Sequence, residues 1–286
     1  MIHGLEHKQG AADDAMVSGS DVAVDFRRRV QSKMKHWLAT WSLLIVSLAL
    51  WEGAVRGANI SPLVLPGPLR VFRSLWSSLG NGFMLEHIRT TVVEILLGLG
   101  TGASFGIALA AVLFQFPGVE RVVRPYIVAS QALPKLALAP IFVLWFGFGL
   151  MPKVLITALI VFFPLFENTL AGLASPPWEE RELFRVLRAN RWQTFWRLRL
   201  PAALPFIFAG LRVAAILSVV GATVSEYVGA NRGLGALIIA AQGALDTPQM
   251  FAVFVLLTAL GLILYGAVIV IERVVVSRRY EPDQYP

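Results

Sequence analysis

The sequence contains no cysteine and few charged residues. The absence of cysteine excludes a disulfide framework and a thiol-ligated metal site. Only four histidines occur, and none of them forms a pair with metal-binding spacing. Charged residues make up 15% of the chain, whereas soluble domains carry about 25%. The sequence also lacks the Gly-x-x-x-x-Gly-Lys-Ser/Thr loop that cradles nucleotide phosphates. We therefore expect neither a bound cofactor nor nucleotide hydrolysis in this chain.

Apolar residues, in contrast, make up 56% of the chain, and the mean hydropathy is +0.67. Several apolar runs reach the roughly 20 residues that a helix needs to cross a bilayer. We predict an all-α, polytopic membrane helix bundle with about six spans, near 37–55, 91–114, 122–148, 154–173, 202–228 and 250–276. Residues 37–276 would form one membrane domain, between a flexible tail at 1–36 and a short tail at 277–286.

The basic residues are distributed unevenly along the chain. Lys and Arg are concentrated in the N-terminal tail, in the loop at 176–200 and at the C-terminal end. Cytoplasmic loops carry such an excess, so we expect both termini and this loop on the cytoplasmic side. The net charge of +7 then reflects membrane topology, and we favour this interpretation strongly over nucleic-acid binding.

Three glycines in the second span, Gly98, Gly102 and Gly106, have four-residue spacing. They share one helical face and would let another helix backbone approach closely. A dinucleotide-binding loop is the alternative for this glycine-rich stretch. No strand precedes it and no acidic partner follows at the required distance, so helix packing is the better interpretation.

Pro134 and Pro140 interrupt the third span. Each removes a backbone donor and clashes with the preceding turn. Such a break is tolerated at membrane depth where the freed carbonyls face protein or a water-filled path, and it would then indicate the translocation pathway. The alternative is a short interfacial helix before Pro134 and an unbroken span after it. A further amphipathic segment at 68–79 should lie on the outer interface or pack against the spans.

The loop at 176–200 is too charged to span the membrane and too amphipathic to be a passive connection. Leu183, Phe184 and Leu187 lie on one side of a short helix. Asn190 is a suitable cap for a second short helix, and Pro201 suits the first turn of the fifth span. We predict two short helices whose apolar stripe packs under the bundle or enters a groove of a partner.

This loop resembles the coupling loop of importer permeases of the ATP-binding cassette (ABC) class. The family motif reads Glu-Ala-Ala, three residues, Gly, and later hydrophobic-x-Leu-Pro. Glu182 and Leu200-Pro201 match it at the right spacing, whereas Arg188 replaces the glycine. Arginine adopts a left-handed bend only at a cost, so Asn190 can carry the turn instead. The resemblance implies that the ATPase contact comprises Glu182, Leu183, Phe184, Arg185, Leu187, Arg188, Ala189 and Asn190.

Further motifs resemble the nitrate, sulfonate and taurine permease group, at 65–68, 132–135, 144–147, 210–212 and 233–235. The segment 245–248 resembles the branch for pyrimidine thiamine precursors and riboflavin-like solutes. The resemblance implies a type I importer-like fold in a bacterial inner membrane, moving such a solute by alternating access. It implies a second copy of the chain, two ATPase subunits that carry ATP and Mg²⁺, and an external solute-binding protein. It implies no enzymatic activity, resident metal or nucleic-acid partner for this chain.

Polar residues within the spans are candidates for the pathway because charge at membrane depth is costly. These candidates are Gln131, Lys135, Asn168, Arg212 and Glu226. Arg212 and Glu226 are too far apart to pair within one straight helix, so each needs a partner on another span or subunit. Structural pairing is the competing role for most of them. The competing functions are a secondary transporter or channel and a membrane-embedded enzyme. We find no internal repeat of the kind that secondary transporters show, and no catalytic cluster that an enzyme would need.

Overall fold

The computed structural model describes residues 38–80, 82–228 and 230–276. The tails predicted at 1–36 and 277–286, and Trp37 at the start of the first span, lie outside the described residues. The chain forms two compact units, Met1–Leu69 and Arg70–Pro286. Every regular element of the described residues is helical, so the predicted all-α class is confirmed.

The described part of the N-terminal unit is a long helix, Leu38–Gly57, followed by turns. Most of its apolar side chains are exposed, as expected for a helix in contact with lipid. Glu52 near its end pairs with Arg56 at 2.6 Å and accepts a hydrogen bond from the Leu69 amide. These contacts fix the chain where the unit ends.

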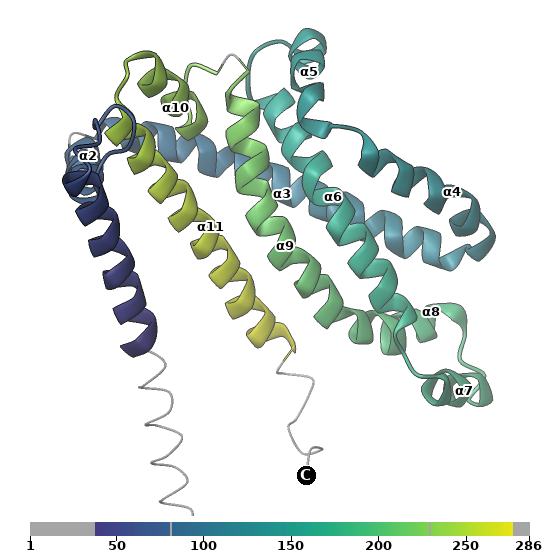
Figure 1. Cartoon of the computed structure of the whole chain (residues 1–286). Helices are drawn as coiled ribbons and strands as arrows, with labels where there is room; N and C mark the ends of the chain where they lie inside the picture. Colours follow the sequence, from purple (N-terminus) through teal and green to yellow (C-terminus); the bar gives the residue numbers. More distant parts are fainter. Residues whose placement is uncertain (1–37, 81, 229, 277–286) are drawn as a thin grey trace, which may run out of the picture. The chain divides into compact units, whose positions relative to one another are not determined.

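The second unit is built around three long helices, α3 (Phe83–Gln115), α6 (Leu150–Ala174) and α9 (Leu200–Glu226). They pack side by side, and α11 (Thr247–Val276) runs along α9 (Figure 1). Short helices lie at the two ends of this unit. At one end are α5 (Ala139–Phe146) and α10 (Leu234–Gly243), and at the opposite end are α7 (Trp178–Val186) and α8 (Arg191–Thr194).

The contact between α3 and α6 depends on the glycine face of α3. Gly98, Gly102 and Gly106 are all buried there. A Cβ atom at Gly102 would approach the Ala158 carbonyl oxygen of α6 to 2.5 Å. Such a distance is far below van der Waals contact, so only glycine allows the two backbones to come this close.

Five helices of the described residues are long and apolar enough to cross a membrane, or six if one bent pair counts as a single span. The long helices are Leu38–Gly57, α3, α6, the continuous stretch Arg191–Glu226 and α11. This agrees with the predicted bundle of about six spans. The second span is longer than predicted, because its helix begins at Phe83.

The third predicted span is the bent pair. Its arms, Pro117–Ala132 and Lys135–Phe146, meet at 82°. The first arm contains α4 (Pro117–Ala129), and the second ends in the eight-residue α5. Leu133, before the proline, is extended, because the Pro134 ring disfavours a helical conformation for the preceding residue. The arm after Pro134 ends at Phe146 and is shorter than the roughly 20 residues of a membrane-crossing helix, so the alternative of an unbroken span after Pro134 is wrong.

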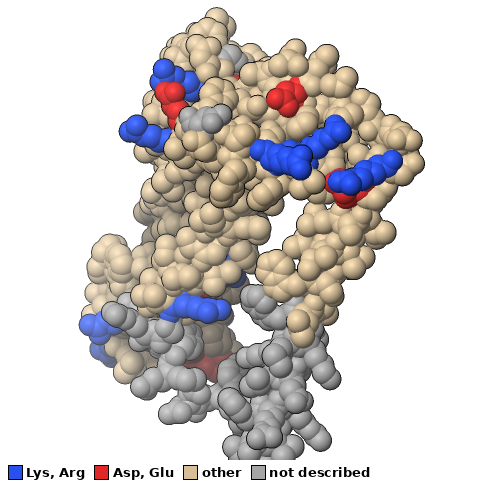
Figure 2. Space-filling model, turned by 90° about the vertical axis from the view of Figure 1, so that its left-hand side faces the viewer, with Lys and Arg blue, Asp and Glu red and all other residues tan. Residues whose placement is uncertain are grey.

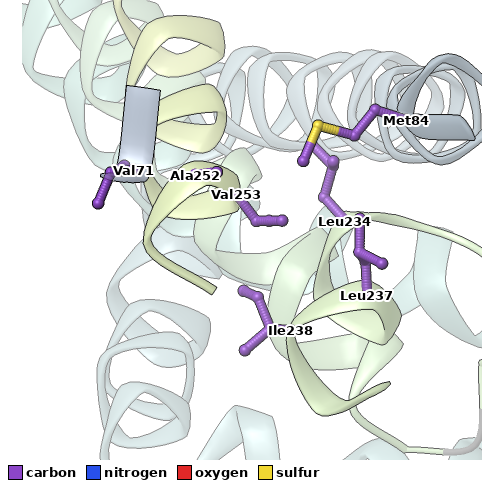
Figure 3. Close-up of a cluster of buried hydrophobic side chains, with 7 residues drawn as sticks. All are labelled: Val71, Met84, Leu234, Leu237, Ile238, Ala252 and Val253. Atoms are coloured by element: carbon purple, nitrogen blue, oxygen red, sulfur yellow. The ribbon is translucent and has the colours of Figure 1, made fainter. Parts of the chain in front are cut away.

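The short helix α10 was not predicted from the sequence. It packs through Leu234, Leu237 and Ile238 against Met84 and the start of α11 (Figure 3). The helix α2 (Pro68–Gly80) contributes Val71 to the same cluster. Ten residues are too few to cross a bilayer, so α10 is a local element that closes one end of the unit.

Candidate functional site

The helix α7 is well specified by its own sequence. Glu179 and Glu180 lie in its first turn and Arg185 in its last, so their charges complement the helix dipole. Arg185 also pairs with Glu182 at 2.6 Å. These contacts are exposed and individually weak, but together they favour a helix between the two spans.

The end of α7 is a tight left-handed turn. The Ala189 amide donates to the Phe184 carbonyl at 3.0 Å, and the Arg188 amide donates to the Arg185 carbonyl at 2.9 Å. These two bonds define a Schellman motif, whose left-handed position is usually glycine. Here Arg188 occupies it, with a φ of 51°. The suggestion that Asn190 carries the turn is wrong, because the turn residue is the one at the family's glycine position.

Asn190 instead begins α8. Its side chain accepts a hydrogen bond from the Gln193 amide at 2.7 Å, and the Gln193 side chain accepts one from the Asn190 amide at 2.9 Å. This reciprocal pair is a capping box. The predicted second short helix, with Asn190 as its cap, is therefore confirmed.

The base of the loop is held rigidly against the bundle. A π-helical turn, Phe195–Arg199, joins α8 to α9 without a break. Phe195 is buried in a cluster with Leu173 of α6. Arg199 donates a hydrogen bond to the Leu173 carbonyl at 3.0 Å and lies 4.6 Å from the centre of the Phe114 ring. These contacts connect the loop to α6, α9 and α3, so a force on the loop would reach the central helices.

An exposed apolar surface remains on α7. Leu183, Val186 and Leu187 are 56%, 72% and 67% exposed, on adjoining positions of the helix. Trp178 at the start of α7 is exposed as well. Phe184, predicted to belong to the same stripe, is half-buried. We define Leu183, Val186 and Leu187 as the α7 apolar surface; the sequence analysis missed Val186, although it lies three residues after Leu183. Such a surface on a charged loop indicates an interaction site.

The five pathway candidates do not meet at one place. Gln131 is exposed in the turn at the break of the third span. Lys135, in the following turn, is half-buried with its ammonium 5.8 Å from the centre of the Phe163 ring. Asn168 donates to the Pro164 carbonyl of its own helix at 2.7 Å. A role of any of these residues in the pathway stays a prediction.

Arg212 and Glu226 lie on α9, and each has its partner on another helix, as their spacing predicted. Arg212 pairs with Glu272 of α11. Glu226 is buried and accepts a hydrogen bond from Thr91 of α3 at 2.7 Å. These contacts support a packing role for both residues.

The sequence analysis did not foresee the pairing of Lys153 with Glu94. Lys153 of α6 donates to Glu94 of α3 at 2.6 Å, and their side chains are 13% and 1% exposed. The pair borders a cavity of about 400 Å³ whose other lining residues include Phe148 and Ser225. A pairing between residues so far apart in sequence has no local pattern that could reveal it.

Residues 102–281 match the family described as "Binding-protein-dependent transport system inner membrane component". The formylaminopyrimidine transport permease protein of Halalkalibacterium halodurans is 38% identical, over 82% of this chain and 93% of the relative. The riboflavin transport system permease protein of Chloroflexus aurantiacus is 36% identical, over 82% and 87%. The taurine transport system permease protein of Escherichia coli K12 is 33% identical, over 73% and 78%.

The fold is also similar to that of solved transporter structures. A crystal structure of an amino acid ABC transporter matches with a TM-score of 0.56 over 71% of this chain and 97% of the other chain. The sequence identity is 16%, so this likeness concerns the fold alone.

Proposed function

The chain belongs to the family of binding-protein-dependent transport system inner membrane components, and from this premise we propose how it works and what it carries. It is a permease subunit. In our proposal, two copies form the pathway in a bacterial cytoplasmic membrane. Two ATPase subunits drive it with ATP and Mg²⁺, and an external binding protein delivers the solute.

The α7 apolar surface is the observation that carries the ATPase contact. Three apolar side chains stand exposed on a rigid, charged loop at one end of the unit. Full burial of each in a groove of a partner would contribute about 1.5–3 kcal/mol. The arginines around them would act at the rim, where charge changes association rate and salt dependence more than affinity. We place this end on the cytoplasmic side, where ATP is available.

A triple variant tests this contact. Leu183→Ser, Val186→Ser and Leu187→Ser together leave the spans and the backbone turn of Arg188 unchanged. We expect the variant to insert normally but to lose the ATPase subunits when it is purified with them in detergent. The matched control is Arg181→Gln with Arg185→Gln on the same helix, which should retain the ATPase with altered salt dependence. Normal assembly and transport by the triple variant would contradict the proposed contact.

We further propose that the solute is a small planar nitrogen heterocycle. The two relatives at 38% and 36% identity are named for formylaminopyrimidine and riboflavin, and the relative at 33% for taurine. Proteoliposomes that contain the complete transporter and its binding protein should accumulate a labelled aminopyrimidine only when ATP is supplied. Excess taurine should not compete. Uptake of taurine alone would refute the solute class, and uptake without ATP would indicate a secondary transporter or channel.

A further inference from the structure

Two buried carboxyl groups meet at the end of the unit that carries α10. Glu94 comes from the middle of α3, and Glu226 is the last residue of α9. Each is 1% exposed. Glu94 lies one turn after Thr91 on α3, and the Thr91 hydroxyl donates to Glu226 at 2.7 Å, so the two carboxyl groups lie at adjoining positions of the same helix contact. Carboxylates are almost never buried without a compensating partner, so the pair requires an explanation that the transport mechanism does not supply.

Glu226 has a donor on each oxygen. Its Oε1 accepts from the Thr91 hydroxyl at 2.7 Å, and its Oε2 accepts from the Gly235 amide. The Thr91 hydroxyl in turn accepts from the Leu234 amide at 2.8 Å. Glu226 and Thr91 therefore satisfy the first amides of α10, which would otherwise be unpaired. The pair of residues fastens α10 to α3 and α9.

Glu94 has a donor on only one oxygen. Its Oε1 accepts from Lys153 of α6 at 2.6 Å. Its Oε2 is fully buried and has no hydrogen-bond partner within the described ranges. An ionised carboxylate oxygen in such a position is costly, whereas a protonated oxygen could donate to the neighbouring Glu226.

The charges around the pair do not balance if both carboxyl groups are ionised. Lys153 is the one cation in contact with them among the described residues. Arg232 is exposed and pairs with Glu86 at 2.6 Å. His87 contacts the backbone of Gly233, and Tyr227 follows Glu226 on the chain. Two adjacent carboxyl groups that share one site rarely ionise together, and one bound proton would make the cluster with Lys153 neutral.

We propose that Glu94 and Glu226 bind one proton between them, carried on Glu94 Oε2 and donated to Glu226, as a latch that holds α10 on α3 and α9. Every oxygen of the pair then has a partner. The native cluster holds a proton that carboxyl groups of an unfolded chain release well below neutral pH. The folded state thus binds more protons, so its stability falls as the pH rises. This latch operates independently of the ATPase and of the solute.

Two isosteric variants of the purified full-length protein test where the proton lies. In Glu94→Gln the amide oxygen can accept from Lys153 and the amide nitrogen can donate to Glu226, which reproduces the protonated acid. We expect this variant to keep the Tm of the parent at neutral pH and to lose the parent's decline in stability, which should begin as the pH rises above the carboxyl pKa of the unfolded chain, about 4.3. In Glu226→Gln the amide nitrogen must face either the Gly235 amide, which is itself a donor, or the Thr91 hydroxyl, whose proton then loses its acceptor. Amide hydrogen exchange in 234–243 should become about tenfold faster or more.

Infrared spectroscopy supplies a readout that does not depend on folding differences between variants. The parent protein should show the carbonyl stretch of a buried protonated carboxyl group, shifted in D₂O, and Glu94→Gln should lack it. Absence of this band in the parent would overturn the proposal. The proposal would also be overturned if Glu94→Gln lowered the Tm or loosened 234–243 while Glu226→Gln did not. Equal losses in both variants, or no change in either, would overturn it as well. If Glu226→Gln failed to accumulate, the band and the Glu94→Gln pH profile would still decide.

Discussion

Arg188 combines an unfavourable backbone conformation with a defined structural role. Its φ of 51° lies in the left-handed region, which costs a residue with a Cβ atom about 1–2 kcal/mol. The Schellman bonds of Arg188 and Ala189 require that conformation. The turn is therefore maintained by its hydrogen bonds against the preference of the residue, and it sets the direction in which the chain leaves α7.

This conflict gives a prediction for Arg188 itself. Arg188→Gly should stabilise the turn by about 1 kcal/mol, because glycine adopts positive φ without steric cost. Arg188→Val should loosen it, since a branched side chain is a genuine outlier there. Hydrogen exchange of the Arg188 and Ala189 amides would measure both effects. Faster exchange in the glycine variant than in the parent would contradict the assignment of strain.

The role of Asn190 as a helix cap could be predicted from the sequence, whereas the left-handed conformation of Arg188 could not. Asn190 is followed three residues later by Gln193, a local pattern of a capped helix start, and the structure has that cap. Which residue becomes left-handed depends on where α7 ends, and that end is set by the hydrogen bond from the Ala189 amide to the Phe184 carbonyl. Propensity favours asparagine over arginine at positive φ, but the hydrogen-bond register of the helix end outweighs propensity.

At the scale of elements, long apolar helices were predictable and short ones were not. The proline pair correctly indicated a break in the third span, but the 82° bend depends on which residues around Pro134 leave the helix. The helix α10 has ten residues, all apolar or glycine except Gln242, and is too short to distinguish from a loop by length or periodicity. Its position is set by Thr91 and Met84, which are far away in sequence, and by Glu226 at the end of the preceding helix.

The glycine face of α3 allows a prediction with a control in the same helix. Gly102→Val should separate α3 from α6, because its side chain would meet the backbone of Ala158. Gly100→Ala, which has open space around a Cβ atom, should be neutral or stabilise by up to about 1 kcal/mol. Thermal unfolding in detergent with size-exclusion chromatography would compare them. A Gly102→Val protein as stable as the parent would show that the close contact between α3 and α6 does not contribute to stability.

At the scale of the whole molecule, charge is distributed as a membrane requires. On the face drawn in Figure 2, Lys, Arg, Asp and Glu side chains occupy only small patches, and most of the described surface is uncharged. In the second unit, Arg232 lies at the end that carries α10, and Glu180 lies on α7 at the opposite end. The two ends of this unit should thus face opposite sides of the membrane.

The absence of cysteine makes that orientation directly measurable. Glu180 and Arg232 are both exposed, so the single-cysteine variants Glu180→Cys and Arg232→Cys leave the buried contacts unchanged. We expect a membrane-impermeant maleimide to label Arg232→Cys in intact cells, and to label Glu180→Cys only after permeabilisation, because the basic loop around α7 favours the cytoplasm. Thr157→Cys, buried between α3 and α6, should resist the reagent under both conditions. If intact cells gave labelling at Glu180→Cys and not at Arg232→Cys, the unit would be inserted the other way round. The α7 apolar surface would then lie on the side of the membrane without ATP, and this result would also contradict the proposed ATPase contact.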